Sequence, residues 1–448
     1  MLPQGWVEAD IGELCNLVNG KAFKPSEWSK TGLPIIRIQN LNNSQALYNY
    51  YDREIPDKFL VNRGDLLFAW SGTPGTSFGA HLWMGQKAIL NQHIFKIIFN
   101  DLDIDKNYFK IAINSTLHEL IGKAQGGVGL AHVTKGKFET TKLPLPPLAE
   151  QRRIVAKLDS LTARIARARA ELERVQVLKK QLKHKATQAI FSTNSTWPTA
   201  KLQDLVSDGP TNGWSPSTDS TAQGTLSLKL TATTSSYIRL DKAATKRIHE
   251  TVPYDSKFWL KSGDILIQRA NALEHLGVSA IFYGPEKKYI YPDLMMRVRV
   301  QDENLSRLIW YFLNSPNTRK HFRENATGTA GNMPKINGKI VKQLLVPFPP
   351  SDVRAHVVKS LDTLFARANR LESEAQRALT LLNRLESSLL AKAFRGELVP
   401  QDPTDEPASV LLDRIRAERA ADPKPKRGRK QSTQDMPVPR KRQTEKHG

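Results

Sequence analysis

Hydrophobic positions recur every three or four residues over two long stretches of the chain, 150–191 and 346–396. In the first stretch, the recurring apolar residues are Ile154, Leu158, Leu161, Ile165, Ala168, Leu172 and Val175. Alternating steps of four and three are typical of a helix that packs along a narrow seam, as in a coiled coil. After Val175 the seam moves by one residue to Leu178 and Leu182, which predicts local overwinding of the coil.

The second stretch repeats the first. Pro347 lies 203 positions after Pro144, and the same shift places Phe394 over Phe191 without a gap. At 1.5 Å per residue, a helix of some forty residues is about 60 Å long and needs a partner of similar length. We therefore predict that the two helices pair with each other; the alternative is that each packs on its own domain. The seam expected in the second helix is Val357, Leu361, Leu364, Ala368, Leu371, Ala375, Ala378, Leu382, Leu385 and Leu389.

The regions that precede the two helices also repeat. WVEADIGELC at 6–15 is answered by WPTAKLQDLV at 197–206, and GDLLFAW at 64–70 by GDILIQR at 263–269. Alternating or continuous apolar residues predict single strands over 32–41, 89–99 and 224–231, and an amphipathic helix over 108–123. The fold class is therefore α+β, with two repeated, mixed and strand-rich domains. The expected parts are a first domain (1–142), a first long helix (143–194), a second domain (195–345), a second long helix (346–396), a C-terminal segment with a short helix (397–421) and a basic, disordered tail (422–448).

The charge of the chain points to a polyanionic partner. Lys and Arg number 66 against 44 Asp and Glu, a formal net charge of +22. Such an excess favours nucleic acid, with an anionic membrane surface as the weaker alternative because no basic amphipathic anchor stands out. The only cysteine is Cys15, so the sequence predicts no disulfide framework and a reducing, cytoplasmic location. No signal peptide or membrane-spanning run is expected. The tail motifs KPKRGRK and PRKR could hold phosphates or could simply aid solubility.

Sequence signatures of catalysis are missing. There is no GxxxxGK motif followed by Ser or Thr, and Gly127-Val128-Gly129 lacks the third glycine of a dinucleotide loop. No Asn-Pro-Pro-aromatic stretch marks an amino-methyltransferase site, and the histidines do not cluster at metal-ligand spacing. We expect a binding protein without catalytic residues, metal or cofactor of its own. A nuclease with an unrecognised site remains a further alternative.

The string PLPPLAEQRRIVAKLD at 144–159, with AFRGELVPQ at 393–401, resembles the specificity subunits of type I restriction–modification systems. The second copy departs from the string, with Ser351-Asp352-Val353-Arg354 in place of Leu148-Ala149-Glu150-Gln151. The resemblance implies that each domain is a target recognition domain that reads one half of a split DNA sequence. It implies that the helices set the spacing and dock two methyltransferase subunits, which modify adenine at N6 with S-adenosylmethionine. A restriction motor subunit would join them, with ATP and magnesium on the partner subunits.

Two similar readers on one duplex require a pseudo-two-fold arrangement, which an antiparallel coiled coil would give. Candidate DNA-binding residues are the polar and glycine positions next to strands and on loops, because base edges are read by such side chains. In the first domain they are Arg37, Gln39, Asn40, Trp70, Ser71, Thr73, Gln92, His93, Gly127, Gly129 and His132. In the second they are Lys229, Thr231, Arg269, Asn271, Thr329, Asn332 and Lys335.

The helix starts are the candidate contacts to the partner subunits. The residues expected there are Glu150, Gln151, Arg152, Arg153 and Arg354. The rival reading is a stand-alone architectural coiled-coil protein that binds DNA without methyltransferase partners. It would explain the charge and the helices, but not two dissimilar copies of an elaborate domain.

Overall fold

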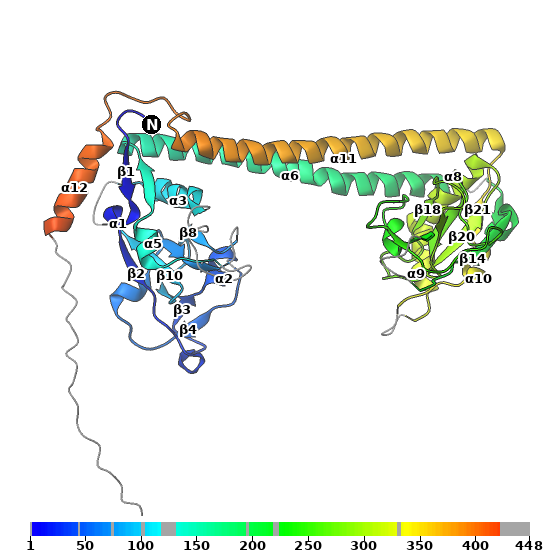
Figure 1. Cartoon of the computed structure of the whole chain (residues 1–448), viewed down its shortest axis with the longest axis horizontal. Helices are drawn as coiled ribbons and strands as arrows, with labels where there is room; N and C mark the ends of the chain where they lie inside the picture. Colours follow the sequence, from blue (N-terminus) through cyan, green and yellow to red (C-terminus); the bar gives the residue numbers. More distant parts are fainter. Residues whose placement is uncertain are drawn as a thin grey trace, which may run out of the picture. The chain divides into compact units, whose positions relative to one another are not determined.

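The computed structural model describes residues 2–43, 45–72, 76–99, 104–117, 131–193, 197–217, 224–328 and 333–421. The chain divides into two compact units. The first unit consists of Met1–Ala166 and Asn383–Gly448, and the second of Arg167–Leu382. Each unit contains one globular domain together with one end of each long helix (Figure 1).

Two sheets form the first domain. One is antiparallel, in the order β2 (Asn16–Asn19), β10 (Ile94–Ile98), β6 (Leu66–Ala69) and β8 (Gly79–Leu82). The other has the order β4 (Asn49–Tyr51), β3 (Leu33–Ile36), β9 (Ala88–Leu90) and β5 (Leu60–Val61), and in it β3 and β9 run parallel. Two short pairs complete the strands, β1 (Val7–Asp10) with β12 (Lys142–Leu145) and β7 (Ser71–Gly72) with β11 (Ala131–His132). The short helices are α1 (Ile11–Leu14), α2 (Ile38–Asn42), α3 (Lys106–Ser115) and α5 (Lys135–Glu139).

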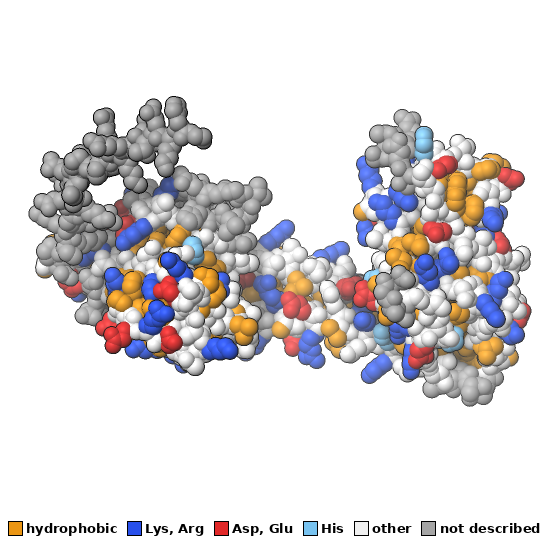
Figure 2. Space-filling view, turned by 90° about the horizontal axis from the view of Figure 1, so that it is seen from below, with side chains coloured by type: hydrophobic (Ala, Val, Ile, Leu, Met, Phe, Trp, Pro, Cys, Tyr) orange, Lys and Arg blue, Asp and Glu red, His pale blue; other side chains and the backbone are white. Residues whose placement is uncertain are grey.

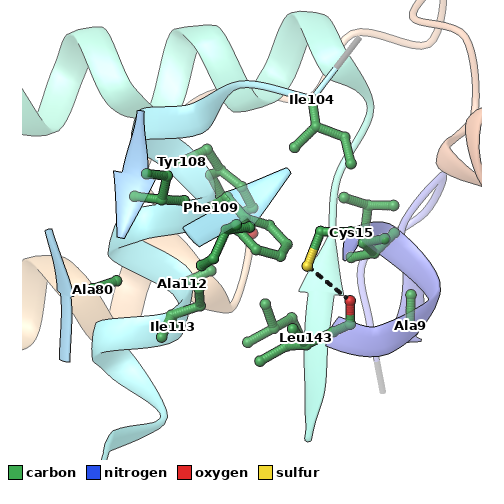
Figure 3. Close-up of a cluster of buried hydrophobic side chains, with 14 of the residues drawn as sticks. Ala9, Cys15, Ala80, Ile104, Tyr108, Phe109, Ala112, Ile113 and Leu143 are labelled. Carbon is green, nitrogen blue, oxygen red and sulfur yellow. Dashed lines mark hydrogen bonds between the residues drawn. The ribbon is translucent and has the colours of Figure 1, made fainter. Parts of the chain in front are cut away.

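The core of the first unit lies between the antiparallel sheet and α3 (Figure 3). Asp105 caps α3 by accepting hydrogen bonds from two backbone amides of its first turn, and Tyr108, Phe109, Ala112 and Ile113 are buried. Cys15 belongs to this core, and its Sγ donates to the Ile11 carbonyl at 3.3 Å. Burial raises the pKa of the Cys15 thiol to about 12. The thiol is therefore an inert part of the packing.

A distant segment closes the same core. The helix α12 (Ala408–Ala421) buries Ala408, Leu411, Leu412 and Ile415 in it. Arg416 Nη2 lies 3.0 Å from Glu13 Oε1, and Arg419 donates to the backbone oxygen of Cys15 at 3.0 Å. The sequence predicted a short helix in this region but not that the helix completes the first domain.

The second domain repeats the plan of the first. Its antiparallel sheet has the order β14 (Asp208–Asn212), β20 (Met295–Arg299), β17 (Ile265–Gln268) and β18 (Ser279–Ile281). The other sheet has the order β16 (Thr245–Arg247), β15 (Leu226–Leu228) and β19 (Tyr289–Ile290), with β15 and β19 parallel. The remaining pair is β13 (Thr199–Lys201) with β21 (Leu345–Pro347), and the helices are α7 (Leu202–Leu205), α8 (Glu303–Leu313), α9 (Pro316–Glu324) and α10 (Gly338–Lys342). The predicted α+β class and the internal repeat are confirmed.

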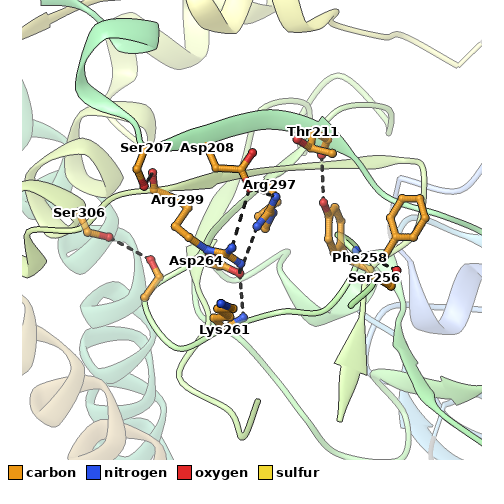
Figure 4. Close-up of polar contacts among 12 residues, drawn as sticks. Ser207, Asp208, Thr211, Ser256, Phe258, Lys261, Asp264, Arg297, Arg299 and Ser306 are labelled. Carbon is orange, nitrogen blue, oxygen red and sulfur yellow. Dashed lines mark hydrogen bonds and ion pairs between the residues drawn. The ribbon is translucent and has the colours of Figure 1, made fainter. Parts of the chain in front are cut away.

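Buried charges tie the central strands of the second domain together (Figure 4). Asp264 is fully buried and accepts two hydrogen bonds from Arg299, at 2.6 and 2.8 Å. Arg297, on the same strand, is also buried and donates to Asp208 at 2.5 Å. At the matching place in the first domain, a single ion pair joins the strands, with Lys96 Nζ 2.7 Å from Asp65.

The long helices are α6 (Leu148–Thr193) and α11 (Ser351–Phe394). In the first unit, the start of α6 shares a core with the end of α11, through Leu158 and Ala393 among others. In the second unit, the end of α6 contacts the first half of α11, where Lys179 forms an ion pair with Glu372 and Lys183 donates to Asn369 at 2.8 Å. Opposite ends meet in each unit, so the helices pair antiparallel, as predicted.

The predicted seam is wrong at Leu371 and Leu385, which are exposed, and its other positions on α11 are buried or half-buried. Leu361, Ala368 and Ala375 are buried. Near Leu371 the residue that faces α6 is Glu372, one position later than predicted, because it pairs with Lys179. On α6 the seam continues through the stems of Lys179 and Lys183 and does not slip to Leu178 and Leu182, which are exposed. No overwinding is needed to explain this geometry.

Three predicted strands are shorter than expected. The strand expected over 32–41 ends at Ile36, and α2 follows it; its counterpart expected over 224–231 ends at Leu228, and a 3-10 turn follows. The run 89–99 is divided between β9 and β10 by a turn at 91–93. Each break changes the direction of the chain where polar residues lie, which places those residues at a sheet edge.

Neither a membrane span nor a metal cluster is seen in the part of the chain that the structure describes. None of its described helices combines the length and apolar character needed to cross a bilayer. Within the same residues, no three His, Cys, Asp or Glu side chains are grouped so that they could hold a metal ion.

Candidate nucleic-acid interface

Three strands of the first domain end at one place. Because β3 and β9 are parallel, with Ile36 opposite Leu90, their carboxyl ends lie at the same sheet edge. The Asn91 amide donates to the Ile36 carbonyl at 3.3 Å, and the Trp70 amide donates to the His93 carbonyl at 3.3 Å. The residues that follow β3, β6 and β9 therefore meet, and we name this place the first reading edge.

Five of the predicted residues come together at the first reading edge. The rings of Trp70 and His93 are 5.3 Å apart between centroids, and Trp70 also stacks on Phe95 at 5.7 Å. Gln92 Nε2 lies 3.0 Å from His93 Nε2. The backbone of Ser71 pairs with that of His132 in the short β7–β11 ladder. The edge thus presents an aromatic platform, an amide and an imidazole.

The residues of α2 divide into two groups. Arg37 lies 5.7 Å from the Trp28 ring centroid, and Gln39 is exposed, so both side chains can take part in a surface contact. Asn40 is only 3% exposed, accepts from the Arg37 amide at 3.0 Å and donates to the Ala46 carbonyl at 3.3 Å. Its amide is used to hold the start of α2 and the loop that follows, so the structure gives it a positioning role and its DNA contact stays a prediction.

A second reading edge occupies the equivalent place in the second domain. Here β15 and β19 are parallel, and β17 lies beside them through Gln268, whose Nε2 donates to the Leu230 carbonyl at 3.1 Å and to Thr233 Oγ1 at 2.8 Å. Arg269 and Asn271 follow β17 directly. Lys335 joins them because its backbone bridges to Ala270.

The side chains at the second reading edge differ in how much of their hydrogen-bonding capacity is used. Arg269 donates once to a backbone carbonyl, that of Asp293, at 3.3 Å, which leaves most of its five donors for a ligand. Asn271 donates to Gln268 at 2.6 Å and accepts from the Ala272 amide at 2.8 Å, so it is held firmly with less capacity to spare. Lys229 donates to the Ala243 carbonyl at 3.2 Å, and Thr231 is exposed.

Two residues that position the second reading edge were missed from the sequence. Gln268 is buried and orients Asn271, and Asp293 accepts from Ser215 at 2.5 Å while its carbonyl orients Arg269. Aligning GDLLFAW with GDILIQR places Gln268 over Ala69 and Arg269 over Trp70. The sequence could have indicated this role, because Gln268 is a polar residue in an apolar strand where the first copy has Ala69.

Some predictions fall outside the described residues. Thr73, Gly127, Gly129, Thr329 and Asn332 are among those whose placement is not described, and of His132 only the backbone is described.

The residues predicted to contact partner subunits hold the helix starts. Glu150 is buried and accepts from the Trp6 indole at 2.9 Å, and burial raises the pKa of its carboxyl group. Gln151 is buried and donates to the Pro146 carbonyl at 3.0 Å. Arg354 is buried and lies 3.2 Å from Asp302. These three side chains fix each helix to its domain, and their contact with a partner stays a prediction.

The two remaining arginines differ from each other. Arg153 forms an ion pair with Asp405 at 2.6 Å, which joins the helix start to the C-terminal segment. Arg152 is exposed, so it alone of the five keeps a side chain free to reach a partner.

Comparison with known proteins decides the family. The model of the "Type I restriction modification DNA specificity domain" matches residues 3–176 and 194–381, which is most of the chain. The chain belongs to the specificity subunits of type I restriction–modification systems. The repeat that organises the sequence is thus the repeat of this family.

Relatives and solved structures agree along nearly the whole length. The specificity subunit of the type I restriction enzyme EcoKI of Escherichia coli K12 is 27% identical over 467 residues, covering 96% of this chain and 99% of the relative. That of StySPI of Salmonella potsdam is also 27% identical, over 96% of this chain and 99% of the relative. The HsdS subunit of Thermoanaerobacter tengcongensis has the same fold, with a TM-score of 0.56 and 20% identity over 89% of this chain and 98% of its own. A chain from a study of complex assembly and conformational transition of the type I R-M system reaches a TM-score of 0.69 at 20% identity, over 89% of this specificity subunit and 100% of that chain.

Proposed function

We propose that this specificity subunit selects a bipartite DNA target, with each domain reading one half. One observation carries the proposal: the same convergence of three strand ends occurs in both domains, but the side chains at the two edges differ. Trp70, Gln92 and His93 occupy the first reading edge, whereas Arg269, Asn271 and Lys335 occupy the second. A shared frame with different side chains suits two different half-sites.

The chemistry of the two edges fits base recognition in the major groove. Arginine pairs with the O6 and N7 acceptors of guanine, and asparagine or glutamine pairs with the edge of adenine. Arg269 keeps most of its donors and follows a fully buried strand, so a base contact would be made from a rigid support. Lys and Arg side chains spread over the surface of both units supply phosphate attraction, with acidic side chains between them (Figure 2).

The long helices would set the spacing of the half-sites and dock the methyltransferase subunits. Leu178 and Leu182 on α6 are 51% and 41% exposed, and Leu381 and Leu385 on α11 are 60% and 47% exposed. Each α11 leucine lies 203 positions after its α6 counterpart, so the repeat carries an equivalent exposed leucine pair on each helix. Exposed apolar side chains at matching positions are expected where two copies of one partner bind.

Catalysis would belong to the partners. We infer that the methyltransferase subunits bring S-adenosylmethionine and modify adenine at N6, and that a restriction subunit brings the ATP- and magnesium-dependent motor. The specificity subunit would then select the DNA sequence and set the spacing of the half-sites, without a catalytic step of its own.

The test is the methylated motif of cells that carry the complete system with an Arg269→Ala subunit. Removing a bidentate guanine contact costs about 1–3 kcal/mol of discrimination, so the second half of the motif should become degenerate at one position. The first half should not change. Modified-base sequencing of the genome gives both halves in one measurement.

Gln92→Ala is the matched variant of the first reading edge, and it should relax only the first half. If either substitution altered both halves, or if neither changed the motif while methylation continued, the two-reader proposal would be wrong.

A further inference from the structure

The helix α9 is pressed against the segment that follows the second reading edge. After Asn271 the chain turns through 272–277, and Gly277 has a φ of +75°. A Cβ at Gly277 would lie 2.2 Å from the ring of Phe322, which is fully buried on α9. Only glycine allows this approach, so the segment after the reading edge and α9 form one tightly packed body.

Polar contacts extend this body to the end of α6. Arg319 Nη2, on α9, donates to the Glu274 carbonyl at 2.7 Å, three residues beyond Asn271. Asn317 Nδ2, at the start of α9, donates to Ser192 Oγ on α6 at 2.9 Å. The helix α9 therefore connects the reading edge of this domain to the helix that enters it.

The cationic side chains of Arg319, Arg323 and Lys180 gather along this connection beside the imidazole of His184. Burial and then the charge of Arg323 lower the pKa of Arg319 to about 10. Burial, Lys180 and Arg319, in that order, lower the pKa of His184. The nearby acids are engaged elsewhere: Glu324 lies 3.7 Å from Lys320, and Glu274 lies 3.2 Å from His275. Among the described residues the Nε of Arg319 has no hydrogen-bond partner although it is buried.

A half-buried guanidinium whose buried Nε has a spare donor, beside the charges of Arg323 and Lys180, is costly unless an anion pairs with it. The geometry points to a phosphate-binding surface formed by Arg319 and Arg323 of α9 with Lys180 and His184 of α6, which holds the DNA backbone next to the half-site read by the second domain. DNA is favoured over an acidic protein because Arg319 is fixed to the segment that continues directly from Asn271. The inference rests on the proposed function and adds that the spacer helix α6 itself contacts the DNA.

Phosphate contacts of this kind would position the duplex without reading it. They would also fix the position of the second half-site along the DNA relative to α6, because residues of α6 would hold the neighbouring phosphates. Each neutralised phosphate should contribute about one unit to the slope of log K against log salt concentration.

The experiment measures binding of the full chain to two fluorescent duplexes over a range of salt concentrations. One duplex carries the motif found by modified-base sequencing, and the other carries the same bases in scrambled order. The double variant Arg319→Gln with Arg323→Gln, and separately Lys180→Gln with His184→Gln, should bind both duplexes more weakly by a similar factor. The salt slope should fall by about two units in the arginine double variant and by about one unit in the Lys180 and His184 variant, because the lowered pKa of His184 leaves its imidazole neutral. The ratio between the two duplexes should stay that of the wild type.

Three controls separate a loss of phosphate contacts from a general loss of charge or of folding. Lys359→Gln with Arg367→Gln removes the same charge from exposed positions on α11 and should leave the slope unchanged. Arg319→Lys with Arg323→Lys should keep the wild-type slope because the charge is retained. Circular dichroism checks that each variant is folded.

An unchanged salt slope in both double variants overturns the inference. So does a loss of methyltransferase binding with unaltered DNA binding, which would assign the cations to an acidic protein surface. Failure of the proposed function is visible separately, because the wild-type chain would then not prefer the motif duplex over the scrambled one.

Discussion

The two units share a plan but are closed in different ways. The second unit is made from one continuous stretch, Arg167–Leu382. The first is assembled from segments at both ends of the sequence, since Ala408, Leu411, Leu412 and Ile415 of α12 fill its core and the Ala408 amide donates to the Gly5 carbonyl at 2.9 Å. The two copies thus share their sheets and reading edges, but the elements that cover the core differ between them.

Internal charge also distinguishes the two units. In the second domain two arginines surround Asp264, and Arg297 is 1% exposed. In the first, Lys96 is 15% exposed and pairs with Asp65 alone. The second domain therefore holds its two arginines between two carboxylates, Asp264 and Asp208, whereas the first domain uses one ion pair there and relies on its C-terminal helix to complete its core.

Removing α12 should have the largest effect and should act on the first unit alone. A stop after Gln401 removes three buried leucine or isoleucine side chains, each of which contributes about 1.5–3 kcal/mol. The thiol of Cys15, buried and with its pKa raised to about 12, should react slowly with a thiol reagent at pH 8 in the full chain and rapidly in the truncated one. Thermal unfolding should keep the transition of the second unit.

The matched control is a stop after Ala421, which keeps α12 and should leave Cys15 protected. A truncated chain whose Cys15 remained protected would show that the first unit does not need α12.

Replacing the buried aspartate Asp264 should give the next largest effect, and it should destabilise the second unit more than the matching change destabilises the first. Asp264→Asn removes the fully buried carboxylate that accepts two hydrogen bonds from Arg299, and breaking a buried pair costs about 3–5 kcal/mol; Asp208 still pairs with Arg297. Asp65→Asn should cost about 1 kcal/mol, because Lys96 is partly exposed and still donates to the Leu60 carbonyl. The free energy of unfolding of each unit, followed by denaturant titration, checks the difference; equal losses would contradict it.

The exposed leucine pairs test whether the two halves are equivalent toward the partner. Leu178→Glu with Leu182→Glu, or Leu381→Glu with Leu385→Glu, should change stability by no more than about 0.5 kcal/mol because these side chains are exposed. Each double variant should lose one of the two methyltransferase subunits, as measured by the mass of the complex. Loss of both subunits from one double variant would mean that the halves do not act independently.

Removing residues 422–448 should have the smallest effect. The segment is rich in Lys and Arg, so a stop after Ala421 should weaken DNA binding by a similar factor for every sequence and reduce the salt slope. Neither half of the methylated motif should change. A change confined to the first half-motif would show that the tail takes part in reading by the unit to which α12 belongs.

The fold was accessible from the sequence because the repeat could be seen directly. A shift of 203 positions aligns both long helices, and equivalent strand segments precede them, so the α+β class and the antiparallel pairing followed from self-similarity and symmetry. The phase of the seam did not follow. A pattern of threes and fours fits Leu371 as well as Glu372, and the structure places Glu372 against α6 because Lys179 supplies its countercharge.

The site was only partly predictable for a related physical reason. Strand periodicity continued through Arg37, so the turn that buries Asn40 was not visible, and burial rather than residue type decides whether an amide reads a ligand or holds a loop. Gln268 was missed because it acts from inside the sheet. Contacts such as that between α12 and the first core join residues some four hundred positions apart, and no local pattern encodes them.

The discontinuity of the first unit has a consequence for biosynthesis. Its domain leaves the ribosome first, yet the last part of its core, Ile415, is made after the whole of the second unit. At 5–20 residues per second, the roughly 250 residues between Ala166 and Ile415 take about 12–50 s to synthesise. During that interval the apolar surface that α12 will cover is open to water, to chaperones and to neighbouring nascent chains, so the domain that is translated first is the one that matures last.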